Sequence, residues 1–322
     1  MSARQPERLE QILLLQADSR PGHPAVVCGE QALTYAELER ASAALGGALA
    51  DAGAGPGERV GLYLPKGVGS VVAAYAVLRT GAAYVPLDPT GPVGRALGIA
   101  RRAGLRIVVL GVPQARRLAA ADEAELRRSG LEHALVLLEG ARDAQPPPVG
   151  PLRVASLSLR RAVAYQGEGP SAAAGGDDTA YILYTSGSTG EPKGVCISHS
   201  SSLFFVRWAA EFAGLTPEDR CSNHAPLFFD LSVFDIYSAM LAGGTTVVVP
   251  AAMSAFPRSL AAYIEQQRMT VWYSVPSTRI SVPLYLGKIT TSPTSRDSSS
   301  SASSPMAITR ACWGFSLAVS GR

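Results

Sequence analysis

Residues 181–194 read Tyr-Ile-Leu-Tyr-Thr-Ser-Gly-Ser-Thr-Gly-Glu-Pro-Lys-Gly, and this stretch decides the fold class. An apolar run, Tyr181–Tyr184, leads into a loop of small and hydroxyl residues, and a second apolar run, Val195–Ile197, follows. Glycines let backbone N–H groups surround an anion, and hydroxyls donate to phosphate oxygens. The candidate phosphate-binding residues are Thr185, Ser186, Gly187, Ser188, Thr189, Gly190 and Lys193. The stretch therefore predicts a polyphosphate loop.

The loop does not follow the Walker pattern, in which Gly-Lys-Ser/Thr opens a helix. Here Pro192 precedes Lys193, and the β-branched residues that follow favour a strand. We therefore expect a hairpin tip without a helix N-terminus. The alternative is a plain Gly/Ser-rich linker. The ordered run of Thr, Ser and Gly between two apolar strands favours the phosphate loop.

The stretch from Tyr184 to Gly194 resembles the phosphate loop of the adenylate-forming superfamily. This superfamily includes acyl-CoA synthetases, luciferases and the amino-acid adenylation domains of nonribosomal peptide synthesis. Three more stretches resemble motifs of the adenylation-domain branch, in the same order: Leu-Thr-Tyr-Ala-Glu-Leu at 33–38, Leu-Arg-Thr-Gly-Ala-Ala-Tyr-Val-Pro-Leu-Asp-Pro at 78–89 and Phe-Asp-Leu-Ser at 229–232. The resemblance implies the α/β N-terminal domain of such an enzyme, with doubly wound, mostly parallel sheets.

The apolar spacing independently indicates helices that alternate with short strands, and this order is typical of a doubly wound parallel sheet. The expected helices are 35–50, 70–80, 95–103, 202–214 and 260–267. The expected strands are 59–64, 84–87, 106–110, 245–249 and 270–273. Two Pro- or Gly-rich stretches, 145–151 and 167–178, are expected to be loops.

The character of the chain changes after about Ser277. Residues 290–305 are rich in Ser, Thr and Pro, and no clear apolar period returns. We therefore expect a partial N-terminal adenylation (AMP-binding) domain over 1–278 and an atypical Ser-rich tail over 279–322. The resemblance implies later Gly-Pro-Thr-Glu and Thr-Gly-Asp stretches and a late catalytic Lys, which are missing here. A truncation or frameshift, with a disordered tail, explains this most simply; a specialised natural tail is the alternative.

The composition agrees with a soluble cytoplasmic enzyme. The chain has 322 residues, of which 47% are hydrophobic and 17% charged, so it can form a sizeable core. A net charge of +3 gives no reason to expect nucleic acid or a membrane as a partner. The four cysteines are scattered without a CxxC pair, which fits a reducing compartment and predicts no metal site.

The stretch 224–237 places two carboxylates, Asp230 and Asp235, in an apolar setting. If a helix starts near Leu231, Phe234 lies one turn away on the same face, and Asp235 points elsewhere. The resemblance implies that Asp230 pairs with the α-ammonium of an amino acid; a simple helix N-cap is the alternative role. Asp230, Leu231, Phe234 and Tyr273 resemble the pocket of enzymes that load L-proline onto carrier proteins. L-Proline is the favoured substrate, and alanine is the second candidate.

The resemblance also implies the reaction. The substrate carboxylate attacks the α-phosphate of ATP, and a phosphopantetheine thiol on a peptidyl carrier protein captures the aminoacyl-adenylate. The loop would hold the β- and γ-phosphates, with Lys193 as its catalytic cation and Mg²⁺ sharing the charge. Two alternatives stay open. One is an acyl- or aryl-CoA ligase of the same superfamily, which Asp230 disfavours. The other is a non-catalytic remnant that binds nucleotide.

Overall fold

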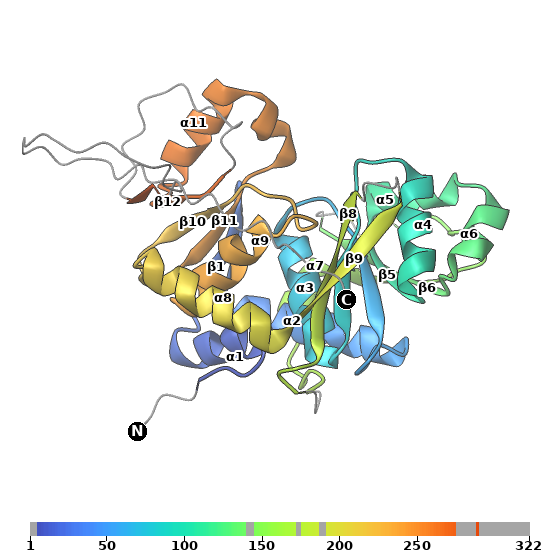
Figure 1. Cartoon of the computed structure of the whole chain (residues 1–322), viewed down its shortest axis with the longest axis horizontal. Helices are drawn as coiled ribbons and strands as arrows, with labels where there is room; N and C mark the ends of the chain where they lie inside the picture. Colours follow the sequence, from blue (N-terminus) through green and yellow to red (C-terminus); the bar gives the residue numbers. More distant parts are fainter. Residues whose placement is uncertain (1–4, 140–144, 172–174, 187–190, 275–287, 290–322) are drawn as a thin grey trace, which may run out of the picture.

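The computed structural model describes residues 5–139, 145–171, 175–186, 191–274 and 288–289. Two β-sheets lie side by side, and helices α2 (Tyr35–Asp51) and α3 (Val68–Thr80) lie between them (Figure 1). Each helix contacts strands or helices of both halves. Every residue of α3 is buried, as expected for a helix with apolar neighbours on all sides.

The seven-stranded sheet carries the hairpin that the sequence singled out. Its order is β7-β6-β5-β3-β4-β8-β9, and all neighbouring pairs are parallel except β8–β9. Its strands are β3 (Arg59–Tyr63), β4 (Ala83–Pro86), β5 (Ile107–Gly111), β6 (His133–Leu138), β7 (Arg153–Ser158), β8 (Thr179–Ser186) and β9 (Pro192–Ser198).

The six-stranded sheet has the order β13-β12-β10-β11-β1-β2, and only β1–β2 is antiparallel. Its strands are β1 (Pro24–Cys28), β2 (Gln31–Thr34), β10 (Arg220–Asn223), β11 (Thr245–Val248), β12 (Val271–Trp272) and β13 (Lys288–Ile289). The prediction of doubly wound, mostly parallel sheets is therefore confirmed.

The remaining helices lie partly around α2 and α3, in the same hydrophobic core, and partly on the far sides of the two sheets (Figure 1). They are α1 (Leu9–Ser19), α4 (Val93–Ala103), α5 (Val112–Ala119), α6 (Glu123–Ser129), α7 (Leu159–Val163), α8 (His199–Phe212), α9 (Leu231–Val233), α10 (Ala239–Leu241) and α11 (Pro257–Gln266). A π-helical turn, η1 (Phe234–Ser238), joins α9 to α10, and a 3₁₀ turn, η2 (Ala251–Ala255), follows β11. No helix in the described part is both long and apolar enough to cross a bilayer.

Each expected helix and strand is present, with ends that differ by at most three residues. The predicted stop at Gly81 is confirmed, because this glycine caps α3 in the left-handed conformation, with φ 83°. Loop 145–151 and the described part of 167–178 contain no helix or strand, as expected. The sequence analysis missed strands β1, β2, β6, β7 and β10, and also the two-residue strand β13, which lies within the expected tail. Residues 275–287 and 290–322 lie outside the described residues, so the expectation for the tail is not tested.

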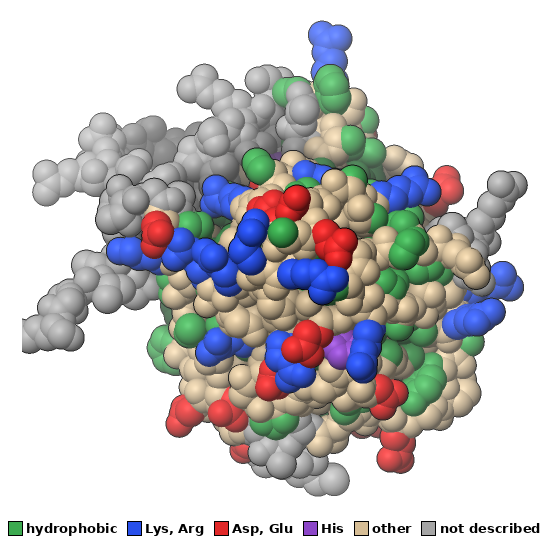
Figure 2. All heavy atoms as spheres, turned by 90° about the vertical axis from the view of Figure 1, so that its right-hand side faces the viewer, with side chains coloured by type: hydrophobic (Ala, Val, Ile, Leu, Met, Phe, Trp, Pro, Cys, Tyr) green, Lys and Arg blue, Asp and Glu red, His purple; other side chains and the backbone are tan. Residues whose placement is uncertain are grey.

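The surface around α4, α5 and α6 carries both signs of charge. Figure 2 shows basic and acidic side chains interspersed over this face. Several form ion pairs, including Arg106–Glu132 at 2.8 Å and Arg127–Glu123 at 2.5 Å. These groups therefore neutralise one another locally.

Candidate active site

The predicted phosphate loop is the tip of an antiparallel hairpin. Strands β8 and β9 pair from Thr179 opposite Ser198 up to Ser186 opposite Pro192. Thr185 lies opposite Lys193, and both are exposed at the last described rungs. The candidate residues Gly187, Ser188, Thr189 and Gly190 lie outside the described residues. The hairpin prediction is confirmed for the stem.

The hairpin stem is held from both sides. Arg102 at the end of α4 donates two hydrogen bonds to Glu191, at 2.8 and 3.0 Å. Glu191 is thus already neutralised and does not oppose an anion at the loop. On the inner side, the rings of Tyr84 on β4 and Tyr181 on β8 stack at 5.3 Å. The stem is therefore fixed, while Thr185 and Lys193 stay free to meet a ligand.

Asp230 lies at the end of the loop that follows β10. It is exposed and occupies the N-cap position of α9, but its side chain makes no capping hydrogen bond. The expectation of an apolar setting is therefore wrong for Asp230, because the loop turns its carboxylate outward. The negative charge of Asp230 helps to raise the pKa of Tyr181, after the larger effect of burial. The charge of Asp230 therefore acts on a residue of the hairpin stem.

The other predicted pocket residues come together through a π-helical turn. The rings of Phe234 in η1 and Tyr273, which follows β12, lie 4.9 Å apart. Phe234 is buried, and Leu231 at the start of α9 is half-buried. A π-helix places more residues in one turn than an α-helix and is frequent at functional sites. No signal in the sequence indicated this turn.

Asp235 is completely buried; the helical spacing predicted only that it points away from the face of Asp230, Leu231 and Phe234. Its Oδ2 accepts a hydrogen bond of 3.1 Å from Asn223 Nδ2 at the end of β10. Burial raises the pKa of Asp235 well above the usual range, and the Asn223 bond and the charge of Lys66 oppose this shift. The sequence analysis named neither Asn223 nor Lys66, because they reach Asp235 only through the fold.

Lys66 lies in the connection between β3 and α3, so it belongs to the half of the molecule that carries the seven-stranded sheet. Its Nζ donates a hydrogen bond of 2.6 Å to the backbone oxygen of His224, the first residue of the Asp230 loop. Burial lowers the pKa of Lys66 to about 8, although the nearby Asp235 favours the charged form. The two sheets are thus connected beside the candidate site.

The exposed donors of the hairpin stem fit a polyphosphate. Thr185 offers a hydroxyl and Lys193 a cation, and no ion pair within the described part of the chain occupies Lys193. Among the described residues no group of three or more His, Cys, Asp or Glu side chains could hold a metal ion by itself. Mg²⁺ usually keeps several waters and binds through substrate phosphates, so the residues present fit a metal that arrives with the nucleotide.

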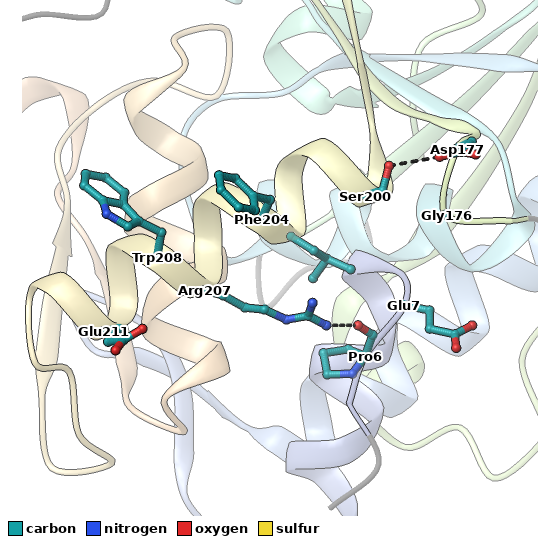
Figure 3. A pocket seen from close by; sticks show the side chains of 10 residues that line it. Pro6, Glu7, Gly176, Asp177, Ser200, Phe204, Arg207, Trp208 and Glu211 are labelled. Carbon is teal, nitrogen blue, oxygen red and sulfur yellow. Dashed lines mark hydrogen bonds between the residues drawn. The ribbon is translucent and has the colours of Figure 1, made fainter.

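A separate hollow lies on the outer side of α8 (Figure 3). Phe204 and Trp208 project from the helix, and Arg207 reaches across to the backbone oxygen of Pro6. The hollow measures ≈ 730 Å³, but none of the predicted phosphate or substrate residues lines it. We therefore place the candidate site at the hairpin stem and the Asp230 loop.

Comparisons with known proteins agree with this geometry. The family described as AMP-binding enzyme matches residues 13–303. An L-proline--[L-prolyl-carrier protein] ligase from Pseudomonas fluorescens is 39% identical over 257 residues, which cover 80% of this chain and 48% of that protein. A ligase of the same name from Streptomyces coelicolor is 35% identical over 275 residues, covering 83% of this chain and 49% of that protein.

Solved structures show the same fold. The nonribosomal peptide synthetase FmoA3 superposes with a TM-score of 0.65 and 30% identity, over 84% of this chain and 26% of that one. The anthranilate CoA ligase AuaEII, in complex with anthranoyl-AMP, superposes with a TM-score of 0.71 and 22% identity, over 85% of this chain and 51% of that one. The chain spans about half the length of the prolyl ligases that it matches. With its hairpin, its sheets and these matches together, the chain belongs to the family of AMP-binding enzymes.

Proposed function

We propose that this chain supplies the nucleotide- and amino-acid-binding part of an AMP-forming ligase. The enzyme activates an amino acid with ATP as aminoacyl-AMP and transfers it to the phosphopantetheine thiol of a peptidyl carrier protein. The observation that supports this most is the antiparallel β8–β9 hairpin, which exposes Thr185 and Lys193 at the described end of its stem. A carboxylate that binds the α-ammonium would leave the substrate carboxylate free to face the phosphates. Residues 1–278 would form this part of the adenylation domain.

The hairpin would hold the β- and γ-phosphates of ATP through Thr185, Ser186 and Lys193, together with the tip residues Gly187 to Gly190. A cation and hydroxyls around the leaving pyrophosphate stabilise the charge that develops on it. ATP would bring Mg²⁺, which supplies further charge neutralisation when bound. The bidentate pair between Arg102 and Glu191 supports this role, because it removes a competing negative charge from the stem.

L-Proline is the substrate that we favour, and alanine is the second candidate. Phe234 and Tyr273 form a compact aromatic pair beside half-buried Leu231, which suits a small apolar side chain. The two relatives named as prolyl ligases support the same choice. An acyl- or aryl-CoA ligase would gain nothing from an exposed carboxylate at Asp230, because its substrates lack an ammonium group. The likeness to the anthranilate ligase concerns the fold alone.

The test is amino-acid-dependent exchange of labelled pyrophosphate into ATP. The natural protein that contains this chain is assayed with L-proline, L-alanine and simple carboxylic acids. We expect exchange with L-proline above all. Exchange supported only by acids without an amino group would favour the CoA-ligase alternative. Nucleotide binding without any exchange would favour a non-catalytic remnant.

A further inference from the structure

The loop that carries Asp230 is tied to itself at several points. The hydroxyl of Ser232 donates to the backbone oxygens of Leu227 and Phe229, at 3.3 and 2.7 Å. The backbone N–H of Phe229 donates to Pro226 O at 2.9 Å. These bonds define the shape of the loop, but they do not fix the loop relative to either sheet.

Two side chains from outside the loop supply that attachment. Lys66, in the seven-stranded half, donates to His224 O at 2.6 Å. Asp235, one turn beyond the loop in η1, accepts from Asn223 Nδ2 at 3.1 Å, and the same amide donates to Ala225 O at 3.2 Å. Both attachments act on the first residues of the loop, seven residues or fewer before Asp230.

Because Asn223 and Asp235 are buried, breaking the hydrogen bond between them is costly. Asp235 is completely buried and Asn223 is 2% exposed, so a missing partner would leave a desolvated polar group. The positive charge of Lys66 also lies near Asp235 and favours its ionised form. A buried polar network of this kind specifies one arrangement of the backbone, because slightly different arrangements lose its hydrogen bonds.

A second contact continues the attachment beyond the loop. The hydroxyl of Tyr237 in η1 donates to the hydroxyl of Tyr84 on β4 at 3.3 Å, and Tyr84 stacks on Tyr181 of the hairpin. The segment 223–238 is therefore connected to the seven-stranded sheet at both of its ends. The distance between the Asp230 loop and the phosphate hairpin depends on these connections.

We propose that Lys66 and Asp235 are positioning residues that clamp the start of loop 224–230 and thereby hold Asp230 at a fixed place beside the phosphate hairpin. The proposal rests on the proposed function for its substrate side, because Asp230 is taken to bind the amino acid. The clamp itself rests on the hydrogen bonds and burial described above. Neither residue touches the substrate in this account.

The first test is hydrogen–deuterium exchange on the 322-residue chain. In Asp235→Ala and Lys66→Met, amides of 225–230 should exchange about tenfold faster or more, because the clamp no longer closes the loop. Asp235→Asn keeps a polar partner for Asn223 and should stay near the wild type. The matched control is Arg59→Met, since Arg59 lies in the same half of the molecule, on β3, and also donates to a backbone oxygen, that of Ala103. Unchanged exchange in both test variants would overturn the clamp.

The second test separates positioning from general damage. In the pyrophosphate exchange assay on the natural protein, Asp235→Ala and Lys66→Met should raise the KM for L-proline about tenfold, since a small displacement of a binding group is costly. The KM for ATP and kcat should change by less than about threefold. Asp235→Asn should restore the KM.

If Asp235→Ala, Lys66→Met and Asp235→Asn all lose kcat equally while the KM for L-proline is unchanged, Lys66 and Asp235 do not position Asp230. If the wild-type protein shows no amino-acid-dependent exchange, the proposed function fails instead. Amide exchange in the loop then still decides whether Lys66 and Asp235 form the clamp.

Discussion

The phosphate hairpin and the segment 223–238 use their polar groups in opposite ways. On the hairpin, Thr185 and Lys193 are exposed, and their contribution depends on a ligand. In the segment, Asn223 and Asp235 are buried, and their hydrogen bonds are made within the protein. Of the two carboxylates in the segment, Asp235 is buried and Asp230 is exposed. The hairpin thus exposes side chains that can bind a ligand, whereas the segment 223–238 holds the Asp230 carboxylate in position.

This difference explains why the phosphate hairpin could be predicted from the sequence and the contacts of the segment 223–238 could not. A loop that binds through its own consecutive residues shows its chemistry in its composition. The segment 223–238 does not show its role in its composition, because Lys66, which contacts it, lies 158 positions from His224 along the chain.

Replacing the exposed carboxylate should have the largest effect. Asp230→Ala should raise the KM for L-proline about 100-fold, because a charge-assisted hydrogen bond contributes about 2–3 kcal/mol. The KM for ATP should stay the same. Kinetics of pyrophosphate exchange give both constants, and an unchanged KM for L-proline would remove Asp230 from the pocket.

Removing the hairpin cation should weaken the nucleotide side instead. Lys193→Ala should lower kcat/KM for ATP about 30-fold, since the charge on the leaving pyrophosphate loses one partner. Titration of the variant with ATP and with L-proline separates the two effects. Wild-type values for both substrates would place Lys193 outside the site.

The junction between the hairpin and α8 should respond to acid. His199 is fully buried, its Nδ1 accepts from the N–H of Leu9 at 3.1 Å, and burial lowers its pKa to about 4. Between pH 6.5 and 4 the His199 imidazole binds a proton in the unfolded chain but stays neutral in the folded chain. The free energy of unfolding therefore falls as the pH falls. From pH 7.5 to 5.5 the contribution of His199 should be a loss of about 1 kcal/mol.

Urea unfolding at these two pH values measures the loss. In His199→Gln the difference between the two values should shrink by about that amount, because glutamine can accept from Leu9 without titrating. A variant with the full wild-type dependence on pH would show that another group is responsible.

The exposed pair at the base of the hairpin should have the smallest effect. Arg102→Ala removes the bonds to Glu191, whose side chain is 67% exposed. Exposed ion pairs contribute little to stability, so the midpoint of urea unfolding should hardly move. Affinity for ATP should fall slightly, because Glu191 becomes free to repel phosphate. A loss as large as that in Lys193→Ala would assign Arg102 a direct part in binding.

The sequence predicted the parts of the fold that local patterns determine. Helix α3 and strand β3 show a clear apolar pattern and a glycine stop, and they were found within three residues. Strand β10, Arg220–Asn223, was missed because its residues include Arg, Ser and Asn, and only its position between β11 and β12 buries it. The turn η1 was missed for the same reason, since long-range contacts of Asp235 and Tyr237 stabilise it.

In the proposed function, the exposed carboxylate of Asp230, held in place by the buried clamp, selects an amino acid beside the phosphate hairpin. The most direct test of this selection compares L-proline with cyclopentanecarboxylic acid, which has the same ring size but no amino group, in pyrophosphate exchange by the wild-type protein and Asp230→Ala. The account predicts that the wild type prefers L-proline strongly and that Asp230→Ala loses this preference. Equal exchange with both acids in the wild type, or an undiminished preference in Asp230→Ala, would contradict it.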